Sequence, residues 1–250
     1  MKRFEGSVVA ITGAAGGLGS QIAEAFRAEG ARVSCTDIRK PDSVDPADLW
    51  TVGNIVQTSD ANAFVESTRE RFGALHVLVN CAGAVGRSMV HAIEDDDWDR
   101  VVGVNLTATF KCTRAALKIM RSQEGGVIVN VASQAGVRVQ PNMAHYSASK
   151  AAVLQFTKSV ALEYAPKIRC NSVTPGLIET PLVRQAWIEF ANQVGITFEE
   201  ARAQRLSVIP LQRFQTAQNV SDGILFLASK EACTITGTNL DVSAGELIPR

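Results

Sequence analysis

Short apolar runs alternate along the chain with longer segments whose apolar residues recur at helical spacing. The runs predict strands at residues 8–11, 32–36, 49–52, 75–79, 127–131, 168–173 and 238–242. The segments between them predict helices, most clearly at 59–72, 97–120, 145–164 and 216–227. Strands that are separated by helices form parallel sheets covered on both faces. We therefore expect an α/β fold.

The alternation breaks once, at residues 182–210, where the apolar positions predict a small helical flap inserted into the α/β body. Within it, Thr197 and Glu200 have the spacing of a capping box, which predicts the start of a short second helix. The chain has 250 residues and shows no repeat or linker, and one α/β domain can reach that length. We expect a single domain over residues 1–250 that carries the flap at 182–210.

The composition excludes several classes of partner. Lys and Arg number 25, and so do Asp and Glu, so the formal net charge is zero. Nothing in that balance favours nucleic acid. The five cysteines are scattered, which argues against a disulfide framework or metal site and favours a reducing, cytoplasmic location. No apolar stretch approaches the roughly 20 residues that span a bilayer, so no membrane partner is expected.

The first predicted strand ends in Thr12-Gly-Ala-Ala-Gly-Gly-Leu-Gly19, and a predicted helix follows. Glycines let a backbone approach a pyrophosphate closely, and the start of a helix offers free N–H groups and the positive end of its dipole. A glycine cluster can also be only a tight turn. Its position between a strand and a helix favours a dinucleotide-phosphate site.

Asp37 ends the second predicted strand, about 20 residues after the glycine loop, where a carboxylate accepts hydrogen bonds from the adenosine ribose. Such a carboxylate would repel the 2′-phosphate of NADP, so Asp37 predicts NAD as the cofactor. The alternative is a solvated residue at the end of a strand. Arg39 and Lys40 lie nearby and could tolerate a phosphate.

Tyr146 and Lys150 are four positions apart in a predicted helix and therefore share one of its faces. An ordinary tyrosine has a pKa near 10, which is too high for an efficient base at neutral pH. A cation about 4 Å away can lower that pKa by about 3 units at an effective dielectric near 20. The pair is a candidate acid–base centre, although this spacing alone is usually just a helix face.

Together these motifs closely resemble those of the classical short-chain dehydrogenase/reductase family, over essentially the whole chain. The resemblance is carried by the glycine loop, Asn80-Cys-Ala-Gly83, Asn105, Ser133, Tyr146, Lys150, and Asn171-Ser-Val-Thr-Pro-Gly176 with Thr180. It implies a Rossmann-like, doubly wound parallel sheet with helices on both faces, an oxidoreductase activity and a homotetramer. Cys81, where a second Asn is common, and Asn54, where an Asp often contacts adenine, depart from the pattern.

The resemblance also implies a role for each matching position. Tyr146 would be the acid/base, and Lys150 would lower its pKa and bind the nicotinamide ribose. Ser133 would hold the substrate oxygen, and Asn105 would fix a water that links Lys150 to solvent. The implied cofactor-binding set is Gly13, Ala15, Gly17, Leu18, Gly19, Asp37, Ile38, Asn54, Ile55, Asn80, Ala82, Gly83, Tyr146, Lys150, Pro175, Gly176, Ile178 and Thr180.

In this family the flap covers the nicotinamide end of the cleft, which makes 182–210 a substrate-binding flap. The residues expected to contact a substrate are Ser133, Gln140, Met143, Tyr146 and Trp187. Because the surroundings are mostly apolar, we expect a compact, uncharged aryl or alicyclic alcohol or ketone. The apolar residues of the flap could instead serve only to pack it onto the body.

Two features beside the predicted site have plainer interpretations. The acidic run at residues 94–97 is expected to cap the following helix rather than to bind a metal, because no histidine cluster accompanies it. His145, which precedes Tyr146, is expected at the surface or at the edge of the substrate.

The leading hypothesis is thus an NAD-dependent enzyme that interconverts a secondary alcohol and a ketone. The first alternative is a 3-oxoacyl-(carrier protein) reductase of the same family, which would normally use NADP and a basic docking surface. The second is a non-catalytic nucleotide-sensing protein on this fold. The Asn105, Ser133, Tyr146 and Lys150 set argues against that second alternative.

Overall fold

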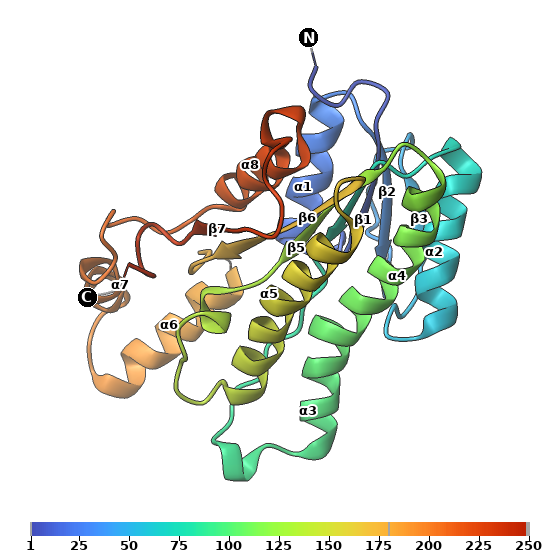
Figure 1. Ribbon diagram of the computed structural model, residues 1–250. Coiled ribbons are helices and arrows are strands. Elements are labelled where there is room, and N and C mark those ends of the chain that lie inside the picture. Colours follow the sequence, from blue (N-terminus) through green and yellow to red (C-terminus); the bar gives the residue numbers. More distant parts are fainter. Residues whose placement is uncertain (1, 180, 249–250) are drawn as a thin grey trace.

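A seven-stranded parallel sheet forms the centre of the molecule, with the strand order β3-β2-β1-β4-β5-β6-β7 (Figure 1). The computed structural model describes residues 2–179 and 181–248, without the side chains of residues 181, 182, 186 and 190. The strands are β1 (Val8–Thr12), β2 (Arg32–Asp37), β3 (Leu49–Val52), β4 (Val77–Asn80), β5 (Gly126–Val131), β6 (Ile168–Pro175) and β7 (Asn239–Val242). This confirms the predicted Rossmann-like fold.

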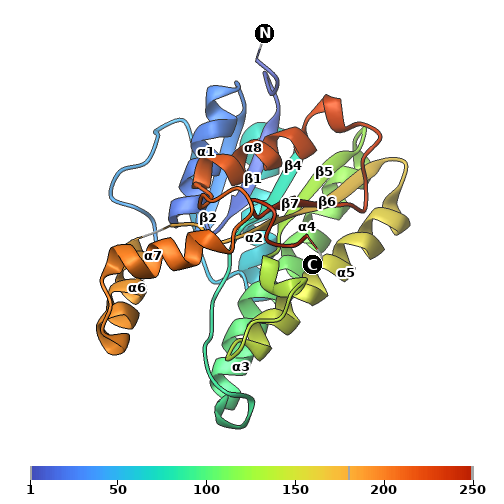
Figure 2. The same cartoon turned by 90° about the vertical axis from the view of Figure 1, so that its left-hand side faces the viewer.

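Helices cover both faces of the sheet (Figures 1 and 2). α1 (Gly17–Ala28) and α8 (Ala217–Ala228) share one apolar layer with β-strand side chains such as Ile11. α2 (Thr58–Phe72), α4 (Ala108–Ser122) and α5 (Ala144–Tyr164) share the other layer with residues such as Ala10. Neighbouring strand residues point to opposite faces, so one buried strand feeds both layers.

The predicted helix at 97–120 is present, and it contains one wider turn that the sequence did not indicate. α3 (Asp95–Val102) passes into a π-helical turn at Gly103–Thr107, and α4 follows. The wider turn carries Asn105, whose side chain is buried and hydrogen-bonded to Ala84 and Ser149. Those bonds to other elements compensate for the poorer geometry of the turn, and single π-turns are frequent at functional sites.

The predicted helical insertion is present as α6 (Pro181–Val194) and α7 (Phe198–Ser207), which stand out from the body as a pair (Figures 1 and 2). The predicted capping box begins α7: Glu200 N donates to Thr197 Oγ1 at 3.1 Å, and Thr197 N donates to Glu200 Oε2 at 2.8 Å. Short 3₁₀ turns complete the described elements: Val90–Ala92, Gln134–Gly136 and Lys230–Ala232.

Candidate active site

The predicted site residues lie in the segments that follow the carboxyl ends of the central strands, where α/β sheets bind their ligands. The glycine loop follows β1, residues 81–89 follow β4, Ser133 follows β5, and Gly176 follows β6. Thr12 Oγ1 accepts hydrogen bonds from the amides of both Cys81 and Ala82, each at 3.1 Å. The loops after β1 and β4 are thereby tied together along one edge of the sheet.

The glycine loop is built for close backbone approach. Gly13 has φ +70°, and a Cβ there would lie 2.6 Å from Ala82 Cα. A Cβ on Gly19 would lie 2.2 Å from Gly13 O, whereas a Cβ on Gly17 would meet open space. The hydrogen bonds found among the described residues leave the amides of Gly17, Leu18 and Gly19 without a protein acceptor. This helix start therefore fits a phosphate group.

Asp37 lies directly over this loop. Its Oδ2 accepts the Ala15 amide at 3.0 Å, and its Oδ1 accepts the Ile38 amide at 2.7 Å. Two backbone donors thus orient the carboxylate, and each oxygen retains a lone pair for a further donor. The position suits a ribose hydroxyl, and Ile38 beside it is 73% exposed.

Asn54 and Ile55 lie across from Asp37, because Gly53 N donates to Asp37 O at 3.0 Å. The Asn54 side chain caps its own turn: its Oδ1 accepts the Val56 amide at 3.1 Å. Ile55 is buried in the apolar layer formed with α2 and α4. A contact between Asn54 and an adenine amino group stays a prediction.

The side chain of Asn80 is turned away from the cleft, and a contact between Asn80 and the cofactor stays a prediction. Its Nδ2 donates to Thr113 Oγ1 at 3.0 Å and to Asn130 Oδ1 at 2.8 Å, and the residue is buried. These polar side chains on β4, β5 and α4 form hydrogen bonds with one another because burial removes their hydrogen bonds to water. Only the backbone of Asn80 remains available to a cofactor.

The four predicted catalytic residues come from three further elements. Tyr146 and Lys150 occupy the first two turns of α5, Ser133 follows β5, and Asn105 lies in the π-turn. Lys150 is 3% exposed, and its Nζ donates to Val131 O at 2.8 Å. A Cβ added to Gly83 would lie 3.4 Å from Asn105 Oδ1 and 3.6 Å from Lys150 Nζ. Gly83 therefore lets the loop after β4 pass beside both groups.

Burial dominates the acid–base properties of Tyr146 and Lys150. It raises the pKa of the Tyr146 phenol, and the hydrogen bond with Ser133 acts in the opposite direction. Burial also lowers the pKa of Lys150 to about 8. Desolvation penalises the charged forms of both groups. The predicted lowering of the Tyr146 pKa by Lys150 stays a prediction.

Asn105 is held by protein groups on two sides. Its Nδ2 donates to Ala84 O and to Ser149 Oγ, both at 2.9 Å, and its Oδ1 accepts the Ala84 amide at 2.8 Å. Ser149 in turn donates to Tyr146 O at 2.8 Å. Ser149 was missed in the sequence, although its place one residue before Lys150 was a usable signal. A water held by Asn105 stays a prediction.

The segment after β6 carries the remaining predicted cofactor contacts. Pro175 ends β6, and a Cβ on Gly176 would lie 2.4 Å from Gln215 Oε1. Ile178 pairs with Gln215 and packs against the α1–α8 layer. Gln215, buried beneath this segment, was missed because nothing in its local sequence indicates proximity to Gly176. The predicted contact at Thr180 lies outside the described residues.

The predicted substrate contacts occupy two different places. Gln140 and Met143 are half-buried in the segment before α5, and Met143 pairs with Ser88 of the loop after β4. The Trp187 ring packs on Phe214, with 4.8 Å between ring centroids, and on Phe198, with 6.4 Å. The contacts of Trp187 thus fit the packing alternative, and a contact with substrate stays a prediction.

The described residues contain neither a metal-binding cluster nor a membrane-spanning helix. No three His, Cys, Asp or Glu side chains gather there in a way that could hold a metal ion. Within the same part of the chain, none of the helices combines the length and apolar character needed to cross a bilayer.

Comparisons with known proteins connect this geometry to a family. The model of the family described as enoyl-(acyl carrier protein) reductase matches residues 13–246. The 3-oxoacyl-[acyl-carrier-protein] reductase FabG of Thermotoga maritima is 37% identical, covering 98% of this chain and 100% of that protein. The chain belongs to the short-chain dehydrogenase/reductase family. The 2-(R)-hydroxypropyl-CoM dehydrogenase of Xanthobacter autotrophicus is 38% identical, covering 93% and 95%.

Solved structures of similar fold support the same family assignment. The aldohexose dehydrogenase of Thermoplasma acidophilum, in ligand-free form, has a TM-score of 0.91 at 33% identity, covering 100% of this chain and 97% of that one. A variant of actinorhodin polyketide ketoreductase, solved with NADPH, has a TM-score of 0.89 at 30% identity, covering 97% and 98%. The chain is therefore an oxidoreductase that uses a nicotinamide cofactor and acts on CH–OH groups, which confirms the predicted enzyme class.

Proposed function

We propose that the protein is an NAD-dependent dehydrogenase of secondary alcohols, or the corresponding ketone reductase, with Tyr146 as its acid/base. The observation that carries this proposal is the placement of Asn105 and Lys150 beside Gly83, together with the hydrogen bond between Ser133 and Tyr146. That cluster lies at the same edge of the sheet as the helix start with its free amides. The proposal includes the roles in cofactor and substrate binding that the sequence predicted for the other site residues.

Different side chains bind the substrate oxygen, transfer the proton and stabilise the charge. A bound nicotinamide cofactor would supply the hydride acceptor for oxidation of the alcohol and the hydride donor for reduction of the ketone. The Ser133 and Tyr146 hydroxyls hold the substrate oxygen, and the Tyr146 oxygen takes the alcohol proton during oxidation or returns it during reduction. Lys150, protonated below about pH 8, places a positive charge beside the phenolate that Tyr146 must form.

NAD is the proposed cofactor because of Asp37. Its carboxylate is fixed by Ala15 and Ile38 over the glycine loop, where the adenosine ribose would lie. A 2′-phosphate at hydrogen-bond distance would meet a like charge. NADP is the alternative cofactor, because a relative was solved with NADPH. The test therefore compares activity with NAD and with NADP.

The proposed substrate is a compact, uncharged aryl or alicyclic alcohol or ketone, with α6 and α7 as the flap over it. The half-buried Gln140 and Met143 support a site with few charges. Arg184, a cation on the flap, lies over the Phe198 ring at 4.6 Å from its centroid. The 3-oxoacyl carrier-protein reductase remains the alternative, since FabG proteins are among the relatives.

A substrate panel tests the proposal. The enzyme is assayed with 1-phenylethanol, cyclohexanol, their ketones, and an acetoacetyl thioester, each with NAD and NADP, by reduced-nicotinamide absorbance. We expect the highest kcat/KM with an uncharged alcohol or ketone and NAD. Highest activity with the thioester and NADPH would establish the alternative. The Tyr146→Phe variant is the control for adventitious reduction.

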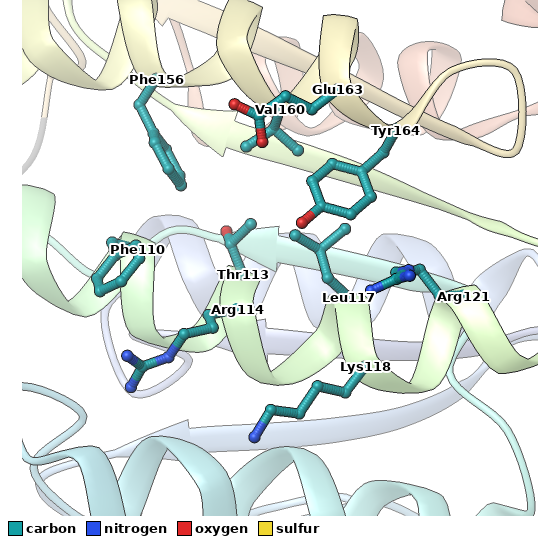
Figure 3. A pocket seen from close by; sticks show the side chains of 10 residues that line it. All are labelled: Phe110, Thr113, Arg114, Leu117, Lys118, Arg121, Phe156, Val160, Glu163 and Tyr164. Carbon is teal, nitrogen blue, oxygen red and sulfur yellow. The ribbon is translucent and has the colours of Figure 1, made fainter.

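We further propose a homotetramer that uses the exposed face of α4 and α5. Figure 3 shows the hollow between these helices, lined by Phe110, Thr113, Arg114, Leu117, Lys118, Arg121, Phe156, Val160, Glu163 and Tyr164. Phe110 is 39% exposed there and meets Phe156 edge to face. Light scattering of the wild type and of Phe110→Glu tests this, and a wild-type monomer would refute it. The cytoplasmic location stays a prediction.

A further inference from the structure

His145, one residue before Tyr146, is completely buried, with an exposed fraction of 0%. The prediction that it lies at the surface or at the substrate edge is therefore wrong. The cause is tertiary packing, since α3 lies beside the start of α5 (Figure 1) and encloses the imidazole. His145 Nε2 lies 3.0 Å from Asp97 Oδ2 on the first turn of α3.

The direction of this hydrogen bond follows from the charge of Asp97. The hydrogen bond from Arg100 is the main cause that lowers the pKa of Asp97, and His145 adds to it. An ionised carboxylate only accepts hydrogen bonds, so His145 Nε2 carries the proton and donates. Arg100 binds Asp97 Oδ1 at 2.6 Å through the same Nη2 that donates to Val85 O at 2.9 Å. A continuous chain of bonds therefore links His145 to the loop after β4.

That loop also packs directly against the imidazole. A Cβ added to Gly86 would lie 1.8 Å from His145 Nε2, so only glycine fits there without displacing the ring. Ser88 N donates to Asn142 O at 2.8 Å, just before α5. Residues 84–88 are thus held between α3 and the start of α5.

The start of α5 needs such an anchor. Met143, its N-cap residue, makes no side-chain capping hydrogen bond within the described residues. The first turn of a helix has no preceding turn to hold it, so an uncapped start is prone to fray. Tyr146 lies in this first turn, where a loose backbone would let its hydroxyl move.

We propose that His145 is a positioning residue which, through Asp97 and Arg100, fixes the first turn of α5 and the hydroxyl of Tyr146 against residues 84–88. The catalytic part of this inference rests on the proposed function of Tyr146. The structural part does not, because it concerns only where the phenol lies and how far water reaches it.

The test follows the phenol of Tyr146 directly. The chain has two tyrosines, Tyr146 and Tyr164, so an isotopic carbon label at tyrosine Cζ gives two NMR signals that Tyr146→Phe assigns. Burial raises the pKa of Tyr146 in the wild type. In His145→Leu we expect water to reach the phenol, and the pKa of Tyr146 should therefore fall toward its ordinary value. We also expect kcat with 1-phenylethanol, or with the best alcohol of the panel, to fall at least about tenfold. The Kd for NAD should change less than about twofold.

Three variants separate positioning from general stability. His76→Leu is the matched control: His76 Nδ1 accepts the Val8 amide at 2.9 Å at the far end of the sheet, so its loss should lower Tm without moving the Tyr146 titration. His145→Gln keeps an N–H donor for Asp97 and should restore much of the effect. Gly86→Ala should reproduce the defect of His145→Leu by pushing the imidazole aside.

The inference is overturned if Tyr146 titrates in His145→Leu as it does in the wild type, or if His76→Leu shifts the Tyr146 titration equally. Should His145→Leu not fold, Asp97→Leu removes both acceptor oxygens at a similar side-chain volume, and the same two criteria apply to it. If Tyr146→Phe retains its turnover, the acid–base proposal fails, while the titration of Tyr146 still decides where the phenol is held.

Discussion

The two ends of the candidate site are built in different ways. The glycine loop is one continuous segment that presents backbone amides to its ligand, and its shape depends on missing side chains at Gly13 and Gly19. The catalytic end gathers side chains from the π-turn, from the end of β5 and from α5. The first is therefore sensitive to added atoms, and the second to removed or displaced functional groups.

The environment of the ionisable groups differs in the same way. Asp37 at the cofactor end is partly exposed and held by two backbone amides. Lys150 is buried and Tyr146 is half-buried, and burial changes the pKa of both. Substitutions at the catalytic end should therefore change stability and chemistry together, whereas those at Asp37 should change mainly selectivity.

The largest effect is expected from Tyr146→Phe. The substitution removes one oxygen from the catalytic end and leaves the glycine loop untouched. Turnover should fall about 10²- to 10⁴-fold, the usual contribution of a general acid–base, with the Kd for NAD nearly unchanged. Steady-state kinetics and fluorescence titration with NADH measure the two quantities. Turnover within a few-fold of the wild type would remove Tyr146 from the mechanism.

Lys150→Met should abolish most turnover and at the same time stabilise the fold. Within the described residues Lys150 has no carboxylate partner, and burial lowers its pKa to about 8 from 10.5. Between those values the unfolded chain binds more protons than the folded one, so wild-type stability rises with pH there.

The gain from Lys150→Met should accordingly be greatest below pH 8, on the order of 1–3 kcal/mol, and shrink toward pH 10. Urea unfolding at a series of pH values measures it. A variant that is less stable than the wild type at pH 7 would contradict the argument that the buried ammonium is costly.

Gly19→Ala and Gly17→Ala form a matched pair in the glycine loop. A Cβ at position 19 would overlap Gly13 O, while one at position 17 meets open space. Gly19→Ala should cost about 1–3 kcal/mol of stability, as overpacking does, and weaken NADH binding. Gly17→Ala should leave Tm unchanged or slightly raised. Equal Tm values for the two variants would show that the loop tolerates added atoms.

The smallest effect is expected from Asp37→Ser, which alters the cofactor end without touching the catalytic groups. The ratio of kcat/KM for NAD to that for NADP should fall about tenfold, because the like charge is removed but was already screened by solvent. The ratio is measured at low and moderate ionic strength. A wild type with equal efficiency for both cofactors would show that Asp37 does not select NAD.

Local patterns sufficed for much of the fold. The strand at residues 49–52, the helices near 59–72 and 145–164, and the capping box at Thr197 and Glu200 all follow from periodicity and end signals. Four-residue spacing also placed Tyr146 and Lys150 on one helical face, but their catalytic assignment came from the resemblance to the family.

Other features were decided only by the tertiary structure. The π-turn around Asn105, the burial of His145 and the inward turn of Asn80 each depend on partners 21 to 50 positions away in the chain. The raised pKa of Tyr146 depends likewise on what encloses the phenol. Sequence by itself determined which elements form, since hydrogen bonds and periodicity within an element are local. Only packing determined which polar groups lose water and which partners they gain, since burial depends on every element at once.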